Sequence, residues 1–329
     1  MLREGTLSVL SILGGIVLIA LVGACGTQGQ GSSEQTTGGT APKVVASTTQ
    51  IGDFVRRVGG NVIDVHQILQ PNSDPHDYEP RPEDVQAISG ANLVFVNGDN
   101  LDSWMDDIVP QAGGNPTVVD LSEGVPERLP GESSGAEASK YDPHWWHDPR
   151  NAEAAVTEIR DALDKADPDH EGQYDKNADA YVGKIEQLDK GIQACMDQVP
   201  EDQRKLVTDH DAFNYFANRY GIKVVGAVLP SQSTEAQPSA GETADLISLI
   251  KSENVKAIFP ESSINPNLAQ TIARETGASS GYTLYGDSLG PQGSDADTYL
   301  KMEAANAASM VKGFTGGQQS CSISTSSDG

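Results

Sequence analysis

The chain has 329 residues, enough for two domains of ordinary size, and its formal net charge at pH 7 is −25. A charge this negative excludes nucleic acid as a partner, because affinity for nucleic acid comes mainly from basic patches. It is compatible with a cationic ligand, although an acidic surface also keeps a protein soluble.

The N-terminus has the features of an export signal. Arg3 precedes an apolar run over about residues 7–22, and small residues then lead to Cys25. We predict a signal peptide over 1–24 and a lipidated Cys25, since cysteine in this place resembles a bacterial lipobox. A membrane-spanning anchor is the alternative, but the run is short for it. Residues 25–42, rich in Gly, Ser, Thr and Gln, are predicted to form a lipid-anchored flexible tether.

Strands and helices alternate in the first half of the chain. Strands are predicted at 43–48, 62–69, 91–97 and 117–121, and helices follow the first strand and begin again near Pro82. This alternation predicts an α/β domain with a mostly parallel sheet over 43–166. Residues 122–140 are predicted to form a polar loop without histidine.

A long helix is predicted in the linking segment 167–200, after a shorter helix at 152–165. Its apolar stripe has residues alternately four and three apart, namely Tyr174, Ala178, Tyr181, Ile185, Leu188, Ile192, Cys195 and Val199. A helix of about seven turns is roughly 40 Å long, so it can run along two domains as one rigid link. A coiled-coil dimer competes with this interpretation, but the heptads are few, and we expect a monomer.

The second half repeats the α/β pattern over 201–315. Strands are predicted at 205–208, 223–228, 255–259 and 282–285, and helices at 212–220, 241–252, 266–276 and 298–314. Residues 316–329 are predicted to be a mobile tail. Cys195 and Cys321, the cysteines that remain after Cys25, either form a disulfide or stay free thiols, because sequence does not give the distance between them.

Polar residues recur where the predicted strands end. The stretch 141–149 is held rigid by its prolines and carries two histidines, and other candidates follow strands elsewhere. Open α/β sheets bind ligands at the carboxyl ends of their strands, so one divalent metal could be held between the two domains. The predicted ligands are His76, His144, His210 and Asp287. The alternative is that each residue only caps a helix or bonds within its own loop.

We predict other roles for the remaining histidines and for two acidic residues. His66 alternates within a strand and is predicted to be structural, while His170 opens the long helix and is predicted to be solvated. His147 is a possible outer-shell residue, with ligand and surface roles left open. Glu79 and Glu261 are possible outer-shell residues that orient ligands by hydrogen bonding.

From about residue 43 to residue 314, the chain resembles the zinc/manganese-binding solute-binding lipoproteins of bacterial ABC importers, some of which are adhesin-like. The matching segments are DPHDYEP (74–80), ANLVFVNGDNLD (91–102), DPHWWHDP (142–149), TDHDAFNYFANRYG (208–221), IFPESSINP (258–266) and LYGDSLGPQGSDADTYLKM (284–302). The resemblance implies one metal in a cleft between two similar α/β domains joined by a long rigid helix, with the four ligands given above. It also implies an ABC permease and its ATPase as partners, and a lipid anchor at the outer face of the cytoplasmic membrane. His147 departs from the pattern, because the family often has an apolar residue there.

The predicted ligand set favours zinc. Three imidazoles and one carboxylate suit tetrahedral Zn²⁺, whereas Mn²⁺ prefers more oxygen, and manganese carriers of the family commonly have Glu in place of the third histidine. Mn²⁺ remains the alternative, because the histidine-rich loop of many zinc members is absent. The loop 122–140 instead carries Glu123, Glu127, Glu132 and Glu137. Protons compete for imidazole, so affinity is expected to fall as pH drops through about 6.5.

Two other functional classes were compared with metal transport. A secreted zinc hydrolase would need an open metal position and a general base, as in HExxH, and the chain has no such motif, so we predict no enzyme and no catalytic residue. A surface adhesin would need an exposed aromatic patch, for which only Trp145 and Trp146 are candidates.

Overall fold

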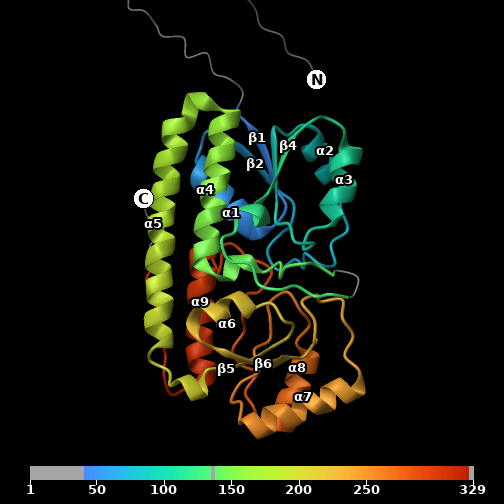
Figure 1. Ribbon diagram of the computed structural model, residues 1–329, viewed down its shortest axis with the longest axis vertical. Helices are drawn as coiled ribbons and strands as arrows, with labels where there is room; N and C mark the ends of the chain where they lie inside the picture. The colour runs from blue at the N-terminus through green and yellow to red at the C-terminus, as the bar shows by residue number, and fades with distance from the viewer. Residues whose placement is uncertain (1–40, 135–137, 326–329) are drawn as a thin grey trace, which may run out of the picture. The chain divides into compact units, whose positions relative to one another are not determined.

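The first half of the chain forms a parallel sheet of four strands in the order β2-β1-β3-β4. This sheet lies in the upper part of Figure 1. The strands are β1 (Lys43–Ala46), β2 (Asp64–Gln67), β3 (Leu93–Val96) and β4 (Thr117–Asp120). The computed structural model describes residues 41–134 and 138–325. The predicted signal peptide, Cys25, most of the tether, Glu137 and residues 326–329 lie outside the described residues.

Both faces of this sheet are covered by helices. Val44 and Phe95 pack into one core and Val45 and Val94 into another, as the two-residue period of a strand requires. The first core also contains apolar residues of α1 (Thr49–Gly59) and α4 (Pro149–Ala166), and the second contains those of α2 (Pro82–Ser89) and α3 (Trp104–Ala112). Helix α3, which has Pro110 inside it, was not expected from the sequence.

The second half has the same plan with a less regular sheet. Strands β5 (Lys205–Thr208) and β6 (Lys223–Ala227) pair in parallel. The strands predicted at 255–259 and 282–285 are wrong as regular strands, because these segments make only isolated parallel bridges, Thr208 with Phe259, Ala257 with Ser279 and Glu261 with Leu284. The resulting spatial order, second-first-third-fourth, repeats that of the first sheet. The helices are α6 (Asn214–Tyr220), α7 (Ala240–Glu253), α8 (Asn267–Thr276) and α9 (Tyr299–Phe314).

One helix runs alongside both halves. This is α5 (Glu171–Met196), which follows a 3-10 turn at Pro168–His170 and is about 39 Å long at 1.5 Å per residue (Figure 1). It packs on α1, α4 and α9, and every residue of the predicted stripe is buried, with Val199 lying beyond the end of the helix. Asn177 donates to the Val58 carbonyl at 2.9 Å in the first half, and Asp189 pairs with Arg219 in the second.

The end of the described chain is tied back to α5. Cys195, near the end of that helix, forms a disulfide with Cys321. Ile323 packs against Gly191, where an added Cβ would approach its Cγ2 to 2.8 Å. Within the described part of the chain, no helix combines the length and the apolar character that crossing a membrane requires.

Candidate metal centre

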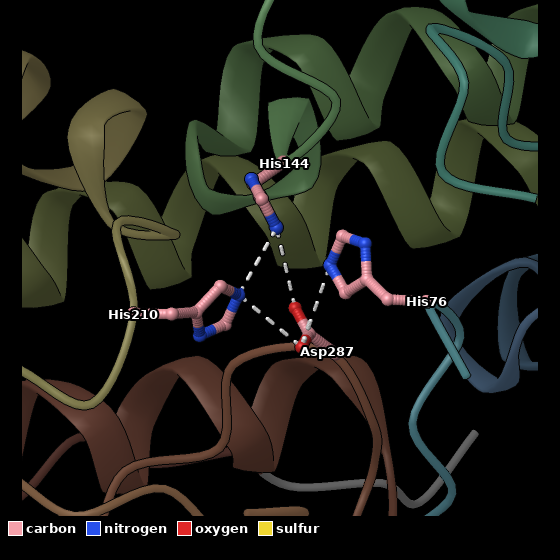
Figure 2. A group of neighbouring side chains, drawn as sticks. All are labelled: His76, His144, His210 and Asp287. Carbon is pink, nitrogen blue, oxygen red and sulfur yellow. Dashed lines mark hydrogen bonds and ion pairs between the residues drawn. The ribbon is translucent and has the colours of Figure 1, made fainter. Parts of the chain in front are cut away.

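Four polar side chains from strand-end loops meet between the two halves. They are His76, His144, His210 and Asp287, and each offers one ligand atom within 4.8 Å of the others (Figure 2). His76 follows β2, His144 lies between β4 and α4, His210 directly follows β5, and Asp287 follows the bridge at Leu284. Each half therefore contributes two side chains from the edge where parallel strands end.

The carboxylate of Asp287 lies among the three imidazoles (Figure 2). Its Oδ1 is 3.4 Å from His144 Nε2, and its Oδ2 is 3.3 Å from His210 Nε2 and 3.9 Å from His76 Nε2. The Nε2 atoms of His144 and His210 are 3.4 Å apart. In a regular tetrahedral site with Zn–N bonds of about 2.05 Å, neighbouring donors are about 3.3 Å apart, so most of these separations fit a bound ion.

The site is closed to solvent. The side chains of His144, His210 and Asp287 are 0% exposed, and that of His76 is 1% exposed. Burying so many ionisable groups costs free energy unless charges are compensated. A divalent cation at the common centre would supply that compensation.

The ring of His144 is oriented by Asp142. Asp142 Oδ1 is 2.8 Å from His144 Nδ1 and accepts the backbone N–H of His144 at 3.0 Å. When Nδ1–H donates to this carboxylate, the lone pair of Nε2 is directed at the centre of the site. Asp74 accepts the backbone N–H of His76 at 3.0 Å in the same way, so the two Asp-Pro-His motifs share one local geometry.

The ring of His210 is oriented from the second half. Glu261 Oε1 is 2.9 Å from His210 Nδ1 and accepts the backbone N–H of His210 at 3.1 Å. Glu261 is itself held by its backbone N–H, which donates to Asp209 Oδ2 at 2.8 Å. Both buried histidines thus have a carboxylate behind them and an Nε2 atom in front, as metal-binding histidines usually do.

In the metal-free site, neighbouring charges and hydrogen bonds favour the charged forms of His144, His210 and Asp287. Burial lowers the pKa of His144, but the hydrogen bonds to Asp142 and Asp287 outweigh it and raise the pKa to about 9. Burial also lowers the pKa of His210, and the charges of Asp287 and Glu261 raise it well above its ordinary value. Burial raises the pKa of Asp287, whereas the neighbouring histidines, His210 first, hold it well below the usual range. At neutral pH, protons therefore occupy His144 and His210 where a cation could replace them.

The other predicted residues lie elsewhere or play other parts. Glu79 is exposed, whereas His147 is buried and lies 2.7 Å from Glu303 through its Nδ1 atom, outside the group of four. His66 contacts Asp84 and His170 contacts Asp167. Trp145 and Trp146 are only 0% and 1% exposed, so they form part of the scaffold and provide no aromatic surface patch.

Sequence reasoning did not assign the carboxylate partners Asp142 and Glu303. For Asp142 a signal was present, because an aspartate stands two residues before the histidine in both Asp-Pro-His motifs. For Glu303 no local signal exists, since its partner is 156 residues away in the chain.

Comparison with known proteins gives consistent matches over the folded part of the chain. A sequence model of the family described as zinc-uptake complex component A, periplasmic, matches residues 44–313. The manganese-binding lipoprotein MntA of Halalkalibacterium halodurans is 33% identical over 303 residues, which cover 91% of this chain and 97% of the relative. The iron-binding protein YfeA of Yersinia pestis is 34% identical over 272 residues, which cover 83% of this chain and 86% of the relative.

Solved structures match the fold as well. The periplasmic zinc-binding protein TroA of Treponema pallidum superposes with a TM-score of 0.77 at 29% identity, covering 83% of this chain and 99% of that chain. A manganese-bound periplasmic metal-binding protein of Candidatus Liberibacter asiaticus superposes with a TM-score of 0.73 at 26% identity, covering 82% of this chain and 98% of that chain. Sequence and fold agree, and the chain belongs to the periplasmic zinc-uptake complex component A family, whose members are solute-binding components of transporters and not enzymes.

Proposed function

We propose that the protein binds a divalent transition metal outside the cytoplasm with high affinity and delivers it to an ABC import permease, with zinc as the cargo. The observation that carries the proposal is the convergence of three histidine Nε2 atoms on the Asp287 carboxylate, at separations of 3.3–3.9 Å. Three imidazoles and one carboxylate at tetrahedral spacing form a donor set that Zn²⁺ favours. His76, His144, His210 and Asp287 are the ligands of this proposal.

The names of relatives support the proposed partners and location. A relative from Streptococcus sanguinis, 32% identical over 94% of this chain and 98% of its own length, is the metal ABC transporter substrate-binding lipoprotein SsaB. We therefore propose a permease and its ATPase as partners. In this proposal the lipid on Cys25 holds the protein at the outer face of the cytoplasmic membrane, and the tether over 25–42 gives it reach.

Manganese is the second candidate cargo, and one observation favours it. Both carboxylate oxygens of Asp287 face imidazole nitrogens, Oδ1 toward His144 and Oδ2 toward His210, so the carboxylate could supply two donors. A second oxygen enlarges the coordination shell in the direction that Mn²⁺ prefers. The relative MntA is named as manganese-binding, and YfeA as iron-binding.

The deciding experiment is elemental analysis of the soluble chain 26–329, together with titration of its metal-free form by Zn²⁺ and Mn²⁺. The expected result is one equivalent of tightly bound zinc, lost in the His76→Ala, His144→Ala and His210→Ala variants. His66→Ala, which removes a histidine outside the site, is the matched control and should bind like the unmodified chain. Tighter binding of manganese would change the cargo. The absence of any stoichiometric metal would overturn the proposal and favour an adhesin-like lipoprotein.

A further inference from the structure

The second histidine of the stretch 141–149, His147, contacts α9 and is not one of the four residues of the candidate metal centre. One 3-10 turn (Trp145–His147) follows His144, and it directs the His147 ring toward α9. The His147 side chain is 0% exposed, its Nδ1 lies 2.7 Å from Glu303 Oε1, and its ring stacks on Phe213 with the centroids 4.3 Å apart. The pair is therefore a buried polar contact that joins the segment carrying His144 to the last helix.

The same helix holds the segment that carries Asp287. Asn306, one turn beyond Glu303, accepts the backbone N–H of Tyr285 at 2.8 Å and donates to the Tyr285 carbonyl at 2.9 Å. Asn306 Nδ2 is also 3.5 Å from Glu303 Oε2. Both side chains are fully buried, so this amide fixes the backbone two residues before Asp287 without competition from water.

A third contact anchors the turn between His144 and His147. The Tyr299 hydroxyl, also on α9, donates to the Trp146 carbonyl at 2.8 Å, and the ring of Tyr299 is buried. Successive turns of one helix therefore hold Trp146, His147 and Tyr285. A rigid helix with short contacts to two segments fixes the distance between the residues that those segments carry.

We infer that His147 and Glu303 are positioning residues, which hold His144 and Asp287 at the separation that a four-coordinate ion needs and so favour zinc over manganese. The separation that they maintain is the 3.4 Å between His144 Nε2 and Asp287 Oδ1. Loss of the contact between His147 and Glu303 removes one of the contacts that tie the His144 segment to α9, so the segment can shift and the site tolerates a larger coordination shell. This inference rests on the proposed function, because it concerns the choice of ion at the same site.

The test compares two substitutions of His147. Leu removes the Nδ1 donor and puts an apolar side chain in its place. The amide nitrogen of Asn lies at the position of Nδ1 and can still donate to Glu303. We expect His147→Leu to weaken zinc binding about 10-fold, the lower end of the effect of losing a group that hydrogen-bonds a ligand directly, because His147 acts on His144 through the backbone. Manganese affinity should change less, and His147→Asn should restore most of the zinc affinity. The visible spectrum of the Co²⁺-loaded protein gives an independent signature, because four-coordinate Co²⁺ absorbs much more strongly than Co²⁺ with a larger shell.

The controls separate positioning from folding. His66→Leu removes a different histidine–carboxylate contact and should leave both affinities and the Co²⁺ spectrum unchanged. If His147→Leu does not fold, the double variant His147→Leu/Glu303→Leu leaves no unpaired buried charge and must show the same loss of zinc preference.

Each result has a distinct meaning. The inference is overturned, and the proposed function is left intact, if the folded His147→Leu chain keeps the zinc affinity and Co²⁺ spectrum of the unmodified protein. The same holds for the double variant where it is used instead. Equal losses of zinc and manganese affinity would overturn the preference for four-coordination. An unmodified chain that binds neither ion would overturn the proposed function and this inference with it.

Discussion

In both His144 and His210, the two ring nitrogens have different partners. In each ring Nδ1 bonds a carboxylate, Asp142 or Glu261, while Nε2 faces Asp287. Because a ring held in this way loses little conformational freedom when an ion binds, the affinity for the ion is higher without any additional contact.

Removal of one ring should therefore remove high-affinity binding. Loss of a group that hydrogen-bonds a metal ligand typically weakens metal binding about 10- to 100-fold. We expect His210→Ala to weaken zinc binding by more than this, because the variant lacks the metal-binding nitrogen itself. Isothermal titration of the metal-free chain measures this, with circular dichroism to check the fold. His170→Ala, at an exposed histidine, is the control, and an unchanged affinity in His210→Ala would remove this residue from the site.

The pH dependence of the metal-free protein follows from His144. Its pKa is about 9 in the folded chain, compared with 6.5 for the unperturbed group. The stabilisation from its proton is therefore complete below pH 6.5 and lost as pH rises through 9, for a decrease of up to about 3 kcal/mol in unfolding free energy. Denaturant midpoints measured from pH 6.5 to 9 test this, and a profile equally steep in His144→Asn would contradict it.

Metal affinity should change in the opposite direction over the same range. Because binding displaces the proton from His144, zinc affinity should rise until pH approaches about 9. The sequence alone predicted a fall through about 6.5, the ordinary value for imidazole, since it does not reveal the carboxylates Asp142 and Asp287 around the ring. Titrations buffered at a series of pH values decide between these two midpoints.

At the scale of secondary structure, α5 and the disulfide form one unit. The bond between Cys195 and Cys321 closes a separation of 126 residues, a loop that includes the whole second half. Disulfides typically stabilise proteins by about 2–4 kcal/mol, mainly by restricting the unfolded chain, and a loop of this length lies at the upper end of that range.

The double variant Cys195→Ser/Cys321→Ser should lose about this amount of unfolding free energy. Its zinc affinity should be unchanged, because neither cysteine belongs to the group of four. Urea denaturation of the oxidised chain, the reduced chain and the variant provides the measurement. An unchanged urea midpoint after reduction of the unmodified chain would contradict the predicted stabilisation by the disulfide.

Sequence periodicity identified the elements whose burial is regular. Strands β1 and β3 are short continuous apolar runs because both faces of the sheet are buried, and the stripe of α5 repeats every three to four residues because one face of the helix is buried. It missed α3, where Pro110 interrupts the expected helix pattern, and it overstated strands at 255–259 and 282–285, which make single bridges. The four residues of the candidate site could be predicted because each lies in a loop after a strand or, for Asp287, after the bridged segment at Leu284. Glu303 and Asn306 could not be found, since their role depends on how α9 packs.

At the scale of the whole molecule, we propose that domains over 43–166 and 201–315 move little against each other around the linking segment 167–200. The reason is that α5 packs on elements of both halves and that Glu132 in the first half accepts hydrogen bonds from Ser231 and Gln232 in the second. Small-angle scattering should give nearly equal radii of gyration with and without metal.

The proposed anchor is tested in the intact cell. Cys25→Ala should abolish incorporation of labelled fatty acid and move the protein from the membrane fraction to the soluble exported fraction. The purified variant should bind metal like the soluble chain, since Cys25 lies outside the family match at residues 44–313. Continued lipid labelling of the variant would refute the anchor.

The burial of the site also determines how fast its contents can exchange. Since His144, His210 and Asp287 are at most 1% exposed, a chelator in solution cannot touch the ion until the chain opens. Loss of metal should then follow the rate of that opening, and adding more chelator should cease to accelerate it. A protein built this way keeps a bound ion for long periods even where competing ligands are abundant, because release requires the chain to open.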